Sequence, residues 1–584
     1  MNADNADNYE VMIGNHAIAR GLVEAGLDLA AAYPGTPSSE ILPGIIKFNE
    51  RENGATYAEW SANERCAFEV AFGAAAAGKQ AACMMKQVGL NVAFPSLLRG
   101  KNKSIKGALV VVSCDDPGPQ SSQTEQDTRL LASIFGIPLL DPASPKEAGD
   151  AAYYALKYSF EHKTPVILRS THRVSHSREA VPLYSPGQRD VVLREGVQAG
   201  TGRKLGIVAS GMSSSLAFDV LTRLDVWEDV SLYKVMKIVP TDKGMIDFVK
   251  MNERILVIEE TDAVLEAIIG EGGKVMGRRN GYIPCQGELT YDTVRDVIGR
   301  TLGEMGILGK AREAFVPDRS VAEALKDVPF SPRPPKLCAG CPHRASFYAM
   351  KQAFPDAVFP GDIGCYTLGI SLGAVDTCLD MGSGVTFASG FYDTFIQDGK
   401  LVPIIASIGD STFFHACLTP LYDAVLKQKR FILVLMDNST TAMTGMQPTP
   451  QTGIAADGTA GHSIRIEDIL TGFGIGFLRV VDPYDVPLLI DTVREAYAYL
   501  EKDGQTPAVI VARRECVLLS KGEQEKIFDP AAFIDACVGC RSCVDLFDCP
   551  GLAFDEEQRK IRIDDGLCLR CGTCLYVCPV QGKI

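Results

Sequence analysis

The chain has 584 residues, 46% of them hydrophobic and 22% charged, and a formal net charge of −14. At ~150 residues per domain, this length corresponds to about four globular domains. The acidic balance and the lack of any Lys/Arg-rich run argue against nucleic acid as a partner.

Nothing in the sequence predicts a membrane segment or an exported protein. Apolar runs such as Phe431–Met436 have only the length of a strand, whereas a membrane-spanning helix needs ~20 apolar residues. Residues Met1–Asp7 are polar and acidic, unlike the basic and apolar segments of a secretion signal, so we expect a cytoplasmic protein. In a reducing compartment, the 18 cysteines predict metal ligation rather than disulfides.

Alternating strand and helix patterns over residues 1–190 predict a first α/β domain with a parallel sheet. A further helix, with Glu40 in its first turn, is expected after the turn Pro34–Ser39. The other expected elements are helices at Gly14–Ala25 and Glu64–Ala77 and strands at Ala30–Tyr33 and Leu109–Ser113.

A second α/β domain is expected over residues 200–325. Leu205–Gly211 has the pattern of a strand that ends in a glycine turn, and Ile255–Glu260 that of another strand. Because no catalytic motif stands out, we interpret this part as a Rossmann-like support domain. The prolines at 332, 334 and 335 then indicate a linker.

A third α/β domain, over residues 335–520, carries a candidate cofactor site. The strand Ile404–Ile408 is followed by Gly409-Asp410-Ser411-Thr412, and the strand Phe431–Met436 by Asp437-Asn438-Ser439-Thr440. Parallel strands would present Asp410 and Asn438 at their carboxyl ends, beside a helix N-terminus that favours a diphosphate. The Asp410 carboxylate, the Asn438 amide oxygen and the Thr440 carbonyl suit Mg²⁺. The alternative is an ordinary turn with an N-capping aspartate.

The last domain, residues 527–584, follows a short charged stretch, Lys521–Lys526, and has the cysteine pattern of a bacterial ferredoxin. Two C-x2-C-x2-C runs, each followed by a Cys-Pro, predict two [4Fe–4S] clusters in which the fourth ligand comes from the other run. The expected ligand sets are Cys537, Cys540, Cys543 and Cys578, and Cys568, Cys571, Cys574 and Cys549. Five residues separate Cys543 from Cys549, where three are usual. A pair of zinc ribbons is the alternative.

Two motifs carry a resemblance to a known family. Gly409-Asp410-Ser411, with Asn438 after it, resembles the GDG…N motif of thiamine diphosphate enzymes, with Ser411 in place of the last glycine. The segment Tyr33-Pro34-Gly35-Thr36-Pro37-Ser38-Ser39 resembles the YPxTPSS motif of 2-oxoacid:ferredoxin oxidoreductases. Residues 337–344 and 361–369 are similar to the alpha subunits of the indolepyruvate type in particular.

The resemblance covers nearly the whole chain and implies a fold for each part. It implies doubly wound parallel sheets in a pyrimidine-binding domain (1–190) and a diphosphate-binding domain (335–520). Residues 200–325 would form a support domain like the transketolase C-terminal domain. Residues 527–584 would form a bacterial-ferredoxin α+β module.

The resemblance also assigns site residues. It implies that Glu64 hydrogen-bonds N1′ of the thiamine pyrimidine and that Thr36 lies near the substrate. The residues expected to hold the cofactor and its Mg²⁺ are Gly409, Asp410, Ser411, Asn438 and Thr440. A third, proximal [4Fe–4S] cluster would be held by Cys338, Cys341, Cys365 and Cys516. His343 and His415 could act as acid/base or orienting groups.

Bland alternatives stay open at each of these positions. Glu64 could be a first-turn helix glutamate, and each histidine could be structural. Cys338 and Cys341 could form a zinc site or a redox pair, with Cys516 a free thiol. Most of the remaining cysteines are expected to be small core residues, namely Cys66, Cys83, Cys114, Cys285, Cys378 and Cys417.

The implied reaction is the oxidative decarboxylation of aryl pyruvates, such as indolepyruvate and phenylpyruvate, with CoA and ferredoxin. A separate beta subunit would supply a gamma domain that is not found here, in an α2β2 assembly. Pyruvate enzymes place an arginine shortly after the strand at Val110–Ser113, where this chain has Cys114-Asp115-Asp116. The alternatives are the same chemistry on pyruvate or branched 2-oxo acids, non-oxidative decarboxylation, and a non-catalytic electron-transfer subunit.

Overall fold

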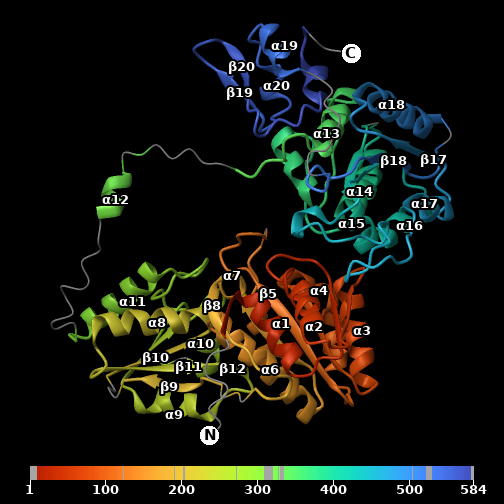
Figure 1. The fold of residues 1–584 in the computed structure, drawn as a ribbon. Helices are drawn as coiled ribbons and strands as arrows, with labels where there is room; N and C mark the ends of the chain where they lie inside the picture. Colours follow the sequence, from red (N-terminus) through yellow and green to blue (C-terminus); the bar gives the residue numbers. More distant parts are fainter. Residues whose placement is uncertain are drawn as a thin grey trace. The chain divides into compact units, whose positions relative to one another are not determined.

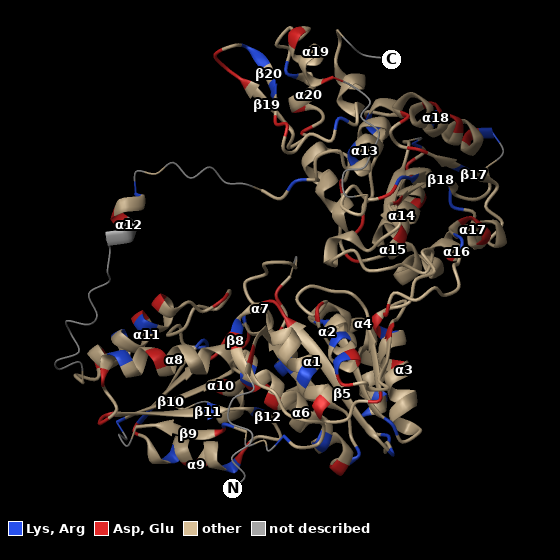
Figure 2. Ribbon diagram, in the orientation of Figure 1, with Lys and Arg blue, Asp and Glu red and all other residues tan. Residues whose placement is uncertain are grey.

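The computed structural model folds into two compact units, Met1–Pro329 and Phe330–Ile584 (Figure 1). It describes residues 9–122, 124–189, 191, 193–200, 204–270, 272–307, 320–326, 328, 334–400, 402–502, 504–520 and 529–580. Three segments with a sequence-based prediction lie outside the described residues, namely Met1–Asp7, Pro332 and Lys521–Lys526. Among the described helices, none combines the length and the apolar character that crossing a bilayer requires. Acidic and basic side chains are interspersed along both units (Figure 2).

A seven-stranded sheet forms the first half of the N-terminal unit, in the order β12-β6-β7-β5-β4-β2-β3. All neighbours are parallel except β12 and β6. Its strands are β2 (Leu29–Ala32), β3 (Tyr57–Trp60), β4 (Gln80–Lys86), β5 (Ala108–Asp115), β6 (Leu139–Leu140), β7 (Val166–Thr171) and β12 (Lys237–Val239). The connecting helices are α1 (Gly14–Glu24), α2 (Ile41–Arg51), α3 (Glu64–Ala76), α4 (Gln87–Gly100), α5 (Thr128–Phe135) and α6 (Pro145–His162).

The helices and strands expected in this half are confirmed to within one or two residues, but the placement of Glu40 was wrong. Glu40 lies at the N-cap of α2, outside the first turn of the helix. Its carboxylate accepts a hydrogen bond from Asn15 Nδ2 at 2.7 Å and lies 3.6 Å from Nε2 of His176, in α7 (His172–His176). The Asn15 amide therefore holds this side chain in place of the first-turn N–H groups, with the His176 ring beside it.

The second half of this unit is a five-stranded sheet in the order β14-β13-β10-β11-β9. Its strands are β9 (Gly196–Ala199), β10 (Leu205–Ser210), β11 (Val230–Val235), β13 (Arg254–Ile258) and β14 (Val275–Met276). The helices around it are α8 (Gly211–Leu224), α9 (Lys243–Met251), α10 (Val264–Ile269) and α11 (Tyr291–Glu304), and α12 (Ser320–Leu325) follows. The two strands expected here are β10 and β13, and all six residues of β10 are buried. A separate antiparallel pair joins β1 (Tyr9–Ile13) to β8 (Arg178–Pro182).

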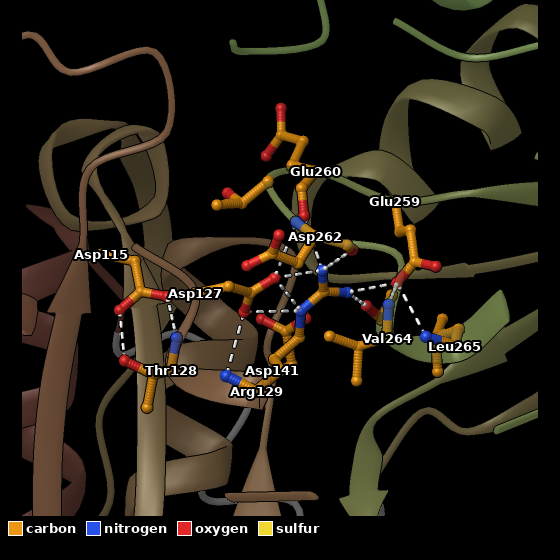
Figure 3. A network of polar contacts seen from close by, with 12 residues as sticks. Asp115, Asp127, Thr128, Arg129, Asp141, Glu259, Glu260, Asp262, Val264 and Leu265 are labelled. Carbon is orange, nitrogen blue, oxygen red and sulfur yellow. Dashed lines mark hydrogen bonds and ion pairs between the residues drawn. The ribbon is translucent and has the colours of Figure 1, made fainter. Parts of the chain in front are cut away.

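A network of buried charges fastens the two sheets together (Figure 3). The Arg129 guanidinium pairs with Asp127 at 2.7 Å and with Glu259 at 3.1 Å. It also donates hydrogen bonds to Ser210 Oγ at 3.0 Å and to the carbonyl oxygen of Asp262 at 3.1 Å. Asp127 is the N-cap of α5, whereas Ser210 ends β10 and Glu259 and Asp262 follow β13. This one side chain therefore ties the ends of strands in the five-stranded sheet to a helix of the seven-stranded sheet.

A second arginine, Arg169 of β7, joins neighbouring strand ends in the same network. It pairs with Asp115, the last residue of β5, at 2.6 Å and with Asp141, just after β6, at 3.0 Å. The charged groups of the network are at most 2% exposed, namely Arg129, Arg169, Asp115, Asp127, Asp141 and Glu259. Burial and the charge of Asp127 raise the pKa of Asp115 to about 6 despite its pairing with Arg169. Burial opposes ionisation of Asp127 as well, but its attraction to Arg129 and Arg169 lowers the pKa of Asp127.

The C-terminal unit contains a four-stranded parallel sheet in the order β15-β16-β18-β17. Its strands are β15 (Ile405–Gly409), β16 (Ile432–Asp437), β17 (Phe477–Val481) and β18 (Ala508–Arg513). The first two confirm the strands expected at Ile404–Ile408 and Phe431–Met436. The helices are α13 (Pro342–Ala353), α14 (Ser383–Gln397), α15 (Asp410–Thr412), α16 (Leu418–Leu426), α17 (Ile466–Gly472) and α18 (Val486–Lys502). Shorter helical turns are η2 (Cys365–Leu372), η3 (Phe413–Cys417, a π-helix) and η4 (Ala442–Thr444).

A small module at the end of the same unit carries the terminal cysteines. It consists of α19 (Pro530–Asp535), α20 (Ser542–Asp545), the antiparallel pair β19 (Leu552–Asp555) and β20 (Lys560–Ile563), and η5 (Thr573–Val577). Arg344 of α13 fastens the module by donating to the carbonyl oxygens of Phe547 at 2.6 Å and Asp548 at 2.7 Å. Lys336 pairs with the Asp548 carboxylate at 2.6 Å. The long gap between Cys543 and Cys549 therefore supplies the residues that dock the module.

The opposite pKa shifts of Asp115 and Asp127 predict opposite pH dependences for their asparagine variants. Asp115 holds its proton more tightly in the folded chain, so the stability it contributes is full below pH ~4 and is lost as the pH rises to about 6. The stability that Asp127 contributes is present above pH ~4 and is lost as the pH falls. Urea unfolding at pH ~3 and pH ~7 should show Asp115→Asn better tolerated at the higher pH and Asp127→Asn better tolerated at the lower pH.

At pH 7 we expect Asp127→Asn to cost ~3–5 kcal/mol, because it removes the closer of the two carboxylates that pair with the buried Arg129 guanidinium. The exposed pair of Asp292 and Arg295 gives a matched control, since Asp292→Asn should change stability by less than ~1 kcal/mol at either pH. The same pH trend in both buried variants would contradict the assignment of the proton to Asp115.

Candidate functional site

Asp410 is a buried carboxylate at the end of β15, with one oxygen left for a ligand. It is 2% exposed, and its Oδ1 accepts a hydrogen bond from the Ser411 N–H at 2.9 Å. Its Oδ2 is buried and has no hydrogen-bond partner among the described residues. Burial and the neighbouring charge of Asp437 raise the pKa of Asp410 well above its usual range. A bound cation would satisfy this oxygen and offset the cost of its burial.

The neighbouring strand brings Asn438 and Thr440 to the same sheet edge. In the parallel pairing, Gly409 of β15 lies opposite Met436 of β16, so both strands end together. The Asn438 Oδ1 accepts a hydrogen bond from the Thr440 N–H at 3.3 Å, across Ser439 in the left-handed region at φ 62°. The sequence prediction that these polar residues gather at one edge is confirmed, while their binding of a metal stays a prediction.

Tyr366 shapes the turn at Gly409, a role that the sequence did not predict. A Cβ at Gly409 would lie 2.3 Å from Tyr366 Cε1, so only glycine leaves room for the ring. The Tyr366 hydroxyl donates to the carbonyl oxygen of Ile363 at 2.8 Å and hydrogen-bonds Thr412 Oγ1 in α15. This side chain therefore fixes the turn from which Asp410 projects. The two glycines at 364 and 409 were its only sequence signal.

His343 lies in this site, one residue inside α13. Its Nε2 lies 3.4 Å from Nδ2 of Asn438, and its ring meets Tyr366 edge to face at 5.9 Å between centroids. Burial lowers the pKa of His343 to about 4, so the neutral ring accepts a hydrogen bond from the Asn438 amide. His415 is also buried, in the π-helix η3 that follows Asp410, a kind of helix that is frequent at functional sites.

Asp362 is a second buried carboxylate that the sequence left without a role. It accepts hydrogen bonds from the N–H groups of Ile363 at 2.8 Å, Gly382 at 2.9 Å and Gly384 at 3.0 Å. It thus caps the N-terminus of α14 from a distant segment, in the manner of an N-cap side chain. This contact fixes the segment between Asp362 and the cysteine at 365.

The four cysteines expected for the proximal cluster gather beside this edge. Burial raises the pKa of Cys365 to about 11, and the thiols of Cys516 and Cys338 add to the shift. Burial also raises the pKa of Cys341 to about 12, with Cys338 and Cys365 as neighbours. The Cys516 N–H donates to the carbonyl oxygen of Asn438 at 3.0 Å, which ties this cysteine to the strand end of the cofactor site.

The terminal cysteines group as the ferredoxin pattern predicts. Cys537, Cys540, Cys543 and Cys578 line one small pocket. In the other set, burial raises the pKa of Cys574, and the nearby thiols of Cys571, Cys549 and Cys568 raise it further. Among the described residues, no group of three His, Cys, Asp or Glu side chains is arranged to hold a single metal ion, so this geometry does not distinguish zinc from clusters. Cluster ligation itself stays a prediction.

The loops of the proximal and terminal sets touch. A Cβ at Gly340 would lie 3.0 Å from Leu569 Cδ1, so the loop between Cys338 and Cys341 packs on the loop between Cys568 and Cys571. The Tyr484 hydroxyl, which is close to Cys571, donates to the carbonyl oxygen of Gly340. Cys543 of the other terminal set is among the thiols near Cys574. The set that includes Cys571 therefore lies next to both the proximal set and the set that includes Cys543.

Glu64 and Thr36 lie in the N-terminal unit, near the carboxyl ends of its strands. Glu64 is the first residue of α3 and is 6% exposed. A Cβ at Gly89, in the first turn of α4, would lie 2.3 Å from Glu64 Oε1, so the carboxyl group packs directly on α4. Thr36 follows β2, and its carbonyl oxygen accepts a hydrogen bond from Ser121 Oγ at 3.2 Å. Their roles toward a cofactor or substrate remain predictions.

The expectation that most of the six unassigned cysteines are small core residues is confirmed. Cys83, Cys114 and Cys417 are buried and Cys378 is half-buried. The exceptions are Cys66 and Cys285, which are exposed. Cys66 lies on the solvent side of α3, where the Ala-rich sequence gave no sign of which face is buried.

Comparison with known proteins matches three parts of the chain to family models. Residues 20–217 match the thiamine diphosphate-binding domain of pyruvate flavodoxin/ferredoxin oxidoreductases. Residues 362–512 match the C-terminal thiamine pyrophosphate-binding domain of thiamine pyrophosphate enzymes. Residues 532–579 match a 4Fe-4S dicluster domain.

Full-length relatives carry one common name, indolepyruvate oxidoreductase subunit IorA. The protein of Archaeoglobus fulgidus is 38% identical, over 97% of this chain and 96% of the relative. That of Thermococcus kodakarensis is 35% identical over the same shares. That of Methanothermobacter thermautotrophicus is 34% identical, over 99% of this chain and 97% of the relative.

The packing of Glu64 on Gly89 predicts a steric test. Gly89→Ala places a methyl group against the buried carboxylate and should cost ~1–3 kcal/mol of stability, as overpacking does. Gly73→Ala, on the open face of α3 with nothing within 4 Å of its Cβ, should instead stabilise by ~0.5–1 kcal/mol. Urea unfolding of both variants measures the difference, and equal effects would contradict the packing.

Proposed function

The chain belongs to the family of indolepyruvate oxidoreductase IorA subunits, and we propose that it oxidatively decarboxylates aryl pyruvates such as indolepyruvate and phenylpyruvate. Membership and the matched domains make it a thiamine diphosphate-dependent 2-oxoacid:ferredoxin oxidoreductase with iron–sulfur clusters. The proposed reaction converts an aryl pyruvate, CoA and two oxidised ferredoxins into the aryl-acetyl-CoA, CO₂, two reduced ferredoxins and a proton. The names of the full-length relatives support the choice of substrate.

The observation that carries the proposal is the buried, half-partnered carboxylate of Asp410 beside Asn438. In the proposed site, Asp410 Oδ2, Asn438 Oδ1 and the Thr440 carbonyl would hold Mg²⁺, whose charge would favour the cofactor's diphosphate there. Gly409 and Ser411, at the start of the helical segment after β15, would lie beside the diphosphate. Thiamine diphosphate, when bound, supplies the electron sink that allows a 2-oxo acid to lose CO₂.

The other proposed roles belong to side chains of fixed geometry. Glu64 hydrogen-bonds N1′ of the cofactor's pyrimidine, and Gly89 leaves its carboxyl group the necessary room. Thr36 contacts the substrate. Neutral His343 orients the Asn438 amide so that its oxygen faces the metal. His415 remains a candidate acid/base group on the helix after Asp410.

Three [4Fe–4S] clusters would carry the electrons outward in the order in which their cysteines lie. The proximal cluster, held by Cys338, Cys341, Cys365 and Cys516, would pass electrons to the set that includes Cys571 and then to the set that includes Cys543. The contact of Gly340 with Leu569 supports this order. A beta subunit with the gamma domain, in an α2β2 assembly, would complete the enzyme, and ferredoxin would accept the electrons.

Substrate preference can be measured on the enzyme assembled with its beta subunit. Ferredoxin reduction should be fastest with indolepyruvate and phenylpyruvate, slower with 2-oxoisovalerate and pyruvate, and dependent on CoA. Glu64→Gln, a variant of the same size, should lower the rate at least ~10²-fold, as loss of a group that exchanges protons does. A preference for pyruvate would overturn the substrate proposal, and full activity of Glu64→Gln would favour a non-catalytic electron-transfer subunit.

Iron content tests the number of clusters. Three cubanes predict about twelve iron atoms per chain, together with one thiamine diphosphate and one Mg²⁺. Cys338→Ser should lower iron to about eight. The exposed Cys66 lies outside all three sets, so Cys66→Ser is a matched control that should leave the iron content unchanged. About eight iron atoms in the unaltered protein would show that the Cys338 set holds no cluster.

A further inference from the structure

A 2-oxo acid brings a carboxylate into the site, and the enzyme needs a cation to hold it. At the carboxyl ends of the seven-stranded sheet, Arg169 and Arg173 are already engaged by carboxylates, those of Asp115 and Glu260 respectively. Lys86, the last residue of β4, is a further cation at this edge, and its ammonium pairs with no carboxylate among the described residues. We propose that Lys86 binds the carboxylate of the 2-oxo acid, an inference that rests on the proposed function.

The strand order places Lys86 between the two segments that would flank a substrate. β4 lies between β2, which leads into Thr36, and β5, which leads into Asp116. The Lys86 ammonium donates a hydrogen bond to the carbonyl oxygen of Ser121 at 2.7 Å, and Ser121 Oγ in turn donates to the carbonyl oxygen of Thr36 at 3.2 Å. The ammonium is therefore in one hydrogen-bonded group with Thr36.

The charge of Lys86 is not consumed by an ion pair. Its hydrogen-bond acceptor is a carbonyl, which leaves two N–H bonds of the ammonium for a ligand. The carboxylate of Asp116 is near, but its oxygens accept from the N–H groups of Gln120 at 3.1 Å and Ser121 at 2.7 Å. Lys86 is half-buried, and a partly desolvated ammonium binds an anion more strongly than a fully solvated one.

The same helix end relates Lys86 to Glu64. Lys86 is the N-cap of α4, a helix of 14 residues whose N-terminus favours a negative charge. Gly89, three residues further on, is the residue against which the Glu64 carboxyl group packs. The first turn of α4 therefore begins at a cation and packs against the glutamate proposed to contact the cofactor.

The structure also explains the glycine in the segment Tyr33–Ser39. A Cβ at Gly35 would lie 2.8 Å from Lys86 Cβ and 3.7 Å from its Cδ. The Lys86 side chain therefore fills the space that any other residue at position 35 would need. The two residues depend on each other, and Gly35 keeps the lysine stem aligned toward Thr36.

The test measures KM and kcat for phenylpyruvate on the enzyme assembled with its beta subunit, and the inhibition constant of methyl phenylpyruvate, a neutral ester. Loss of one charge-assisted contact to a carboxylate predicts a KM about 10- to 100-fold higher in Lys86→Met, with a much smaller change in kcat. The inhibition constant of the ester should not change. Lys86→Arg should recover most of the affinity. Lys79→Met, at the exposed opposite end of β4, is the matched control and should behave as the unaltered enzyme.

The outcomes separate this inference from the proposed function. An unaltered enzyme that does not oxidise phenylpyruvate would overturn the proposed function. An active enzyme whose Lys86→Met variant keeps its KM would overturn the role of Lys86. Equal losses for the acid and the ester would show that Lys86 merely holds the Ser121 loop, which also overturns it. Lys86→Gln can still hydrogen-bond the Ser121 carbonyl but carries no charge, so it must show the same selective loss. Iron and thiamine diphosphate contents of each variant confirm that it has folded.

Discussion

The first turn of α13 is the constraint on which the C-terminal unit depends. Within four residues it presents Cys341 to the proximal cysteine set, His343 to Asn438, and Arg344 to the terminal module. Arg344 is 1% exposed and donates to three carbonyl oxygens, including that of Leu337 at 2.7 Å. A buried guanidinium without these acceptors would be very costly, so the turn, the segment before it and the module hold one arrangement.

Parts of this architecture follow from local sequence and parts do not. The strands before Asp410 and Asn438 are short apolar runs ending in polar residues, and parallel pairing places those residues together without further information. The roles of Tyr366 and Asp362 depend on partners more than fifteen residues away, such as Thr412 and Gly382, which no periodicity encodes. Glycines marked some of these contacts but did not identify the side chain that fills each space.

Residues 114–116 differ from the pyruvate enzymes for a reason that only their contacts in the folded chain reveal. The sequence revealed only that this segment departs from the pyruvate enzymes. The structure gives Asp115 to Arg169 in the buried network, and gives Asp116 to the N–H groups of its own loop. The two carboxylates at the position where pyruvate enzymes have an arginine are therefore already engaged in contacts within the folded chain. The neighbouring strand β4 ends in Lys86, the cation that we propose binds the carboxylate of the substrate.

The long gap between Cys543 and Cys549 has a consequence for modularity. Its added residues bring the Phe547 and Asp548 carbonyls to Arg344, so the iron–sulfur module docks on its host domain through this loop. A free-standing ferredoxin with the usual short gap, grafted onto this chain, would leave the arginine without those acceptors. Recombination between such genes would therefore succeed only when the loop travels with its receptor helix. The irregular spacing therefore matches the module to this particular helix.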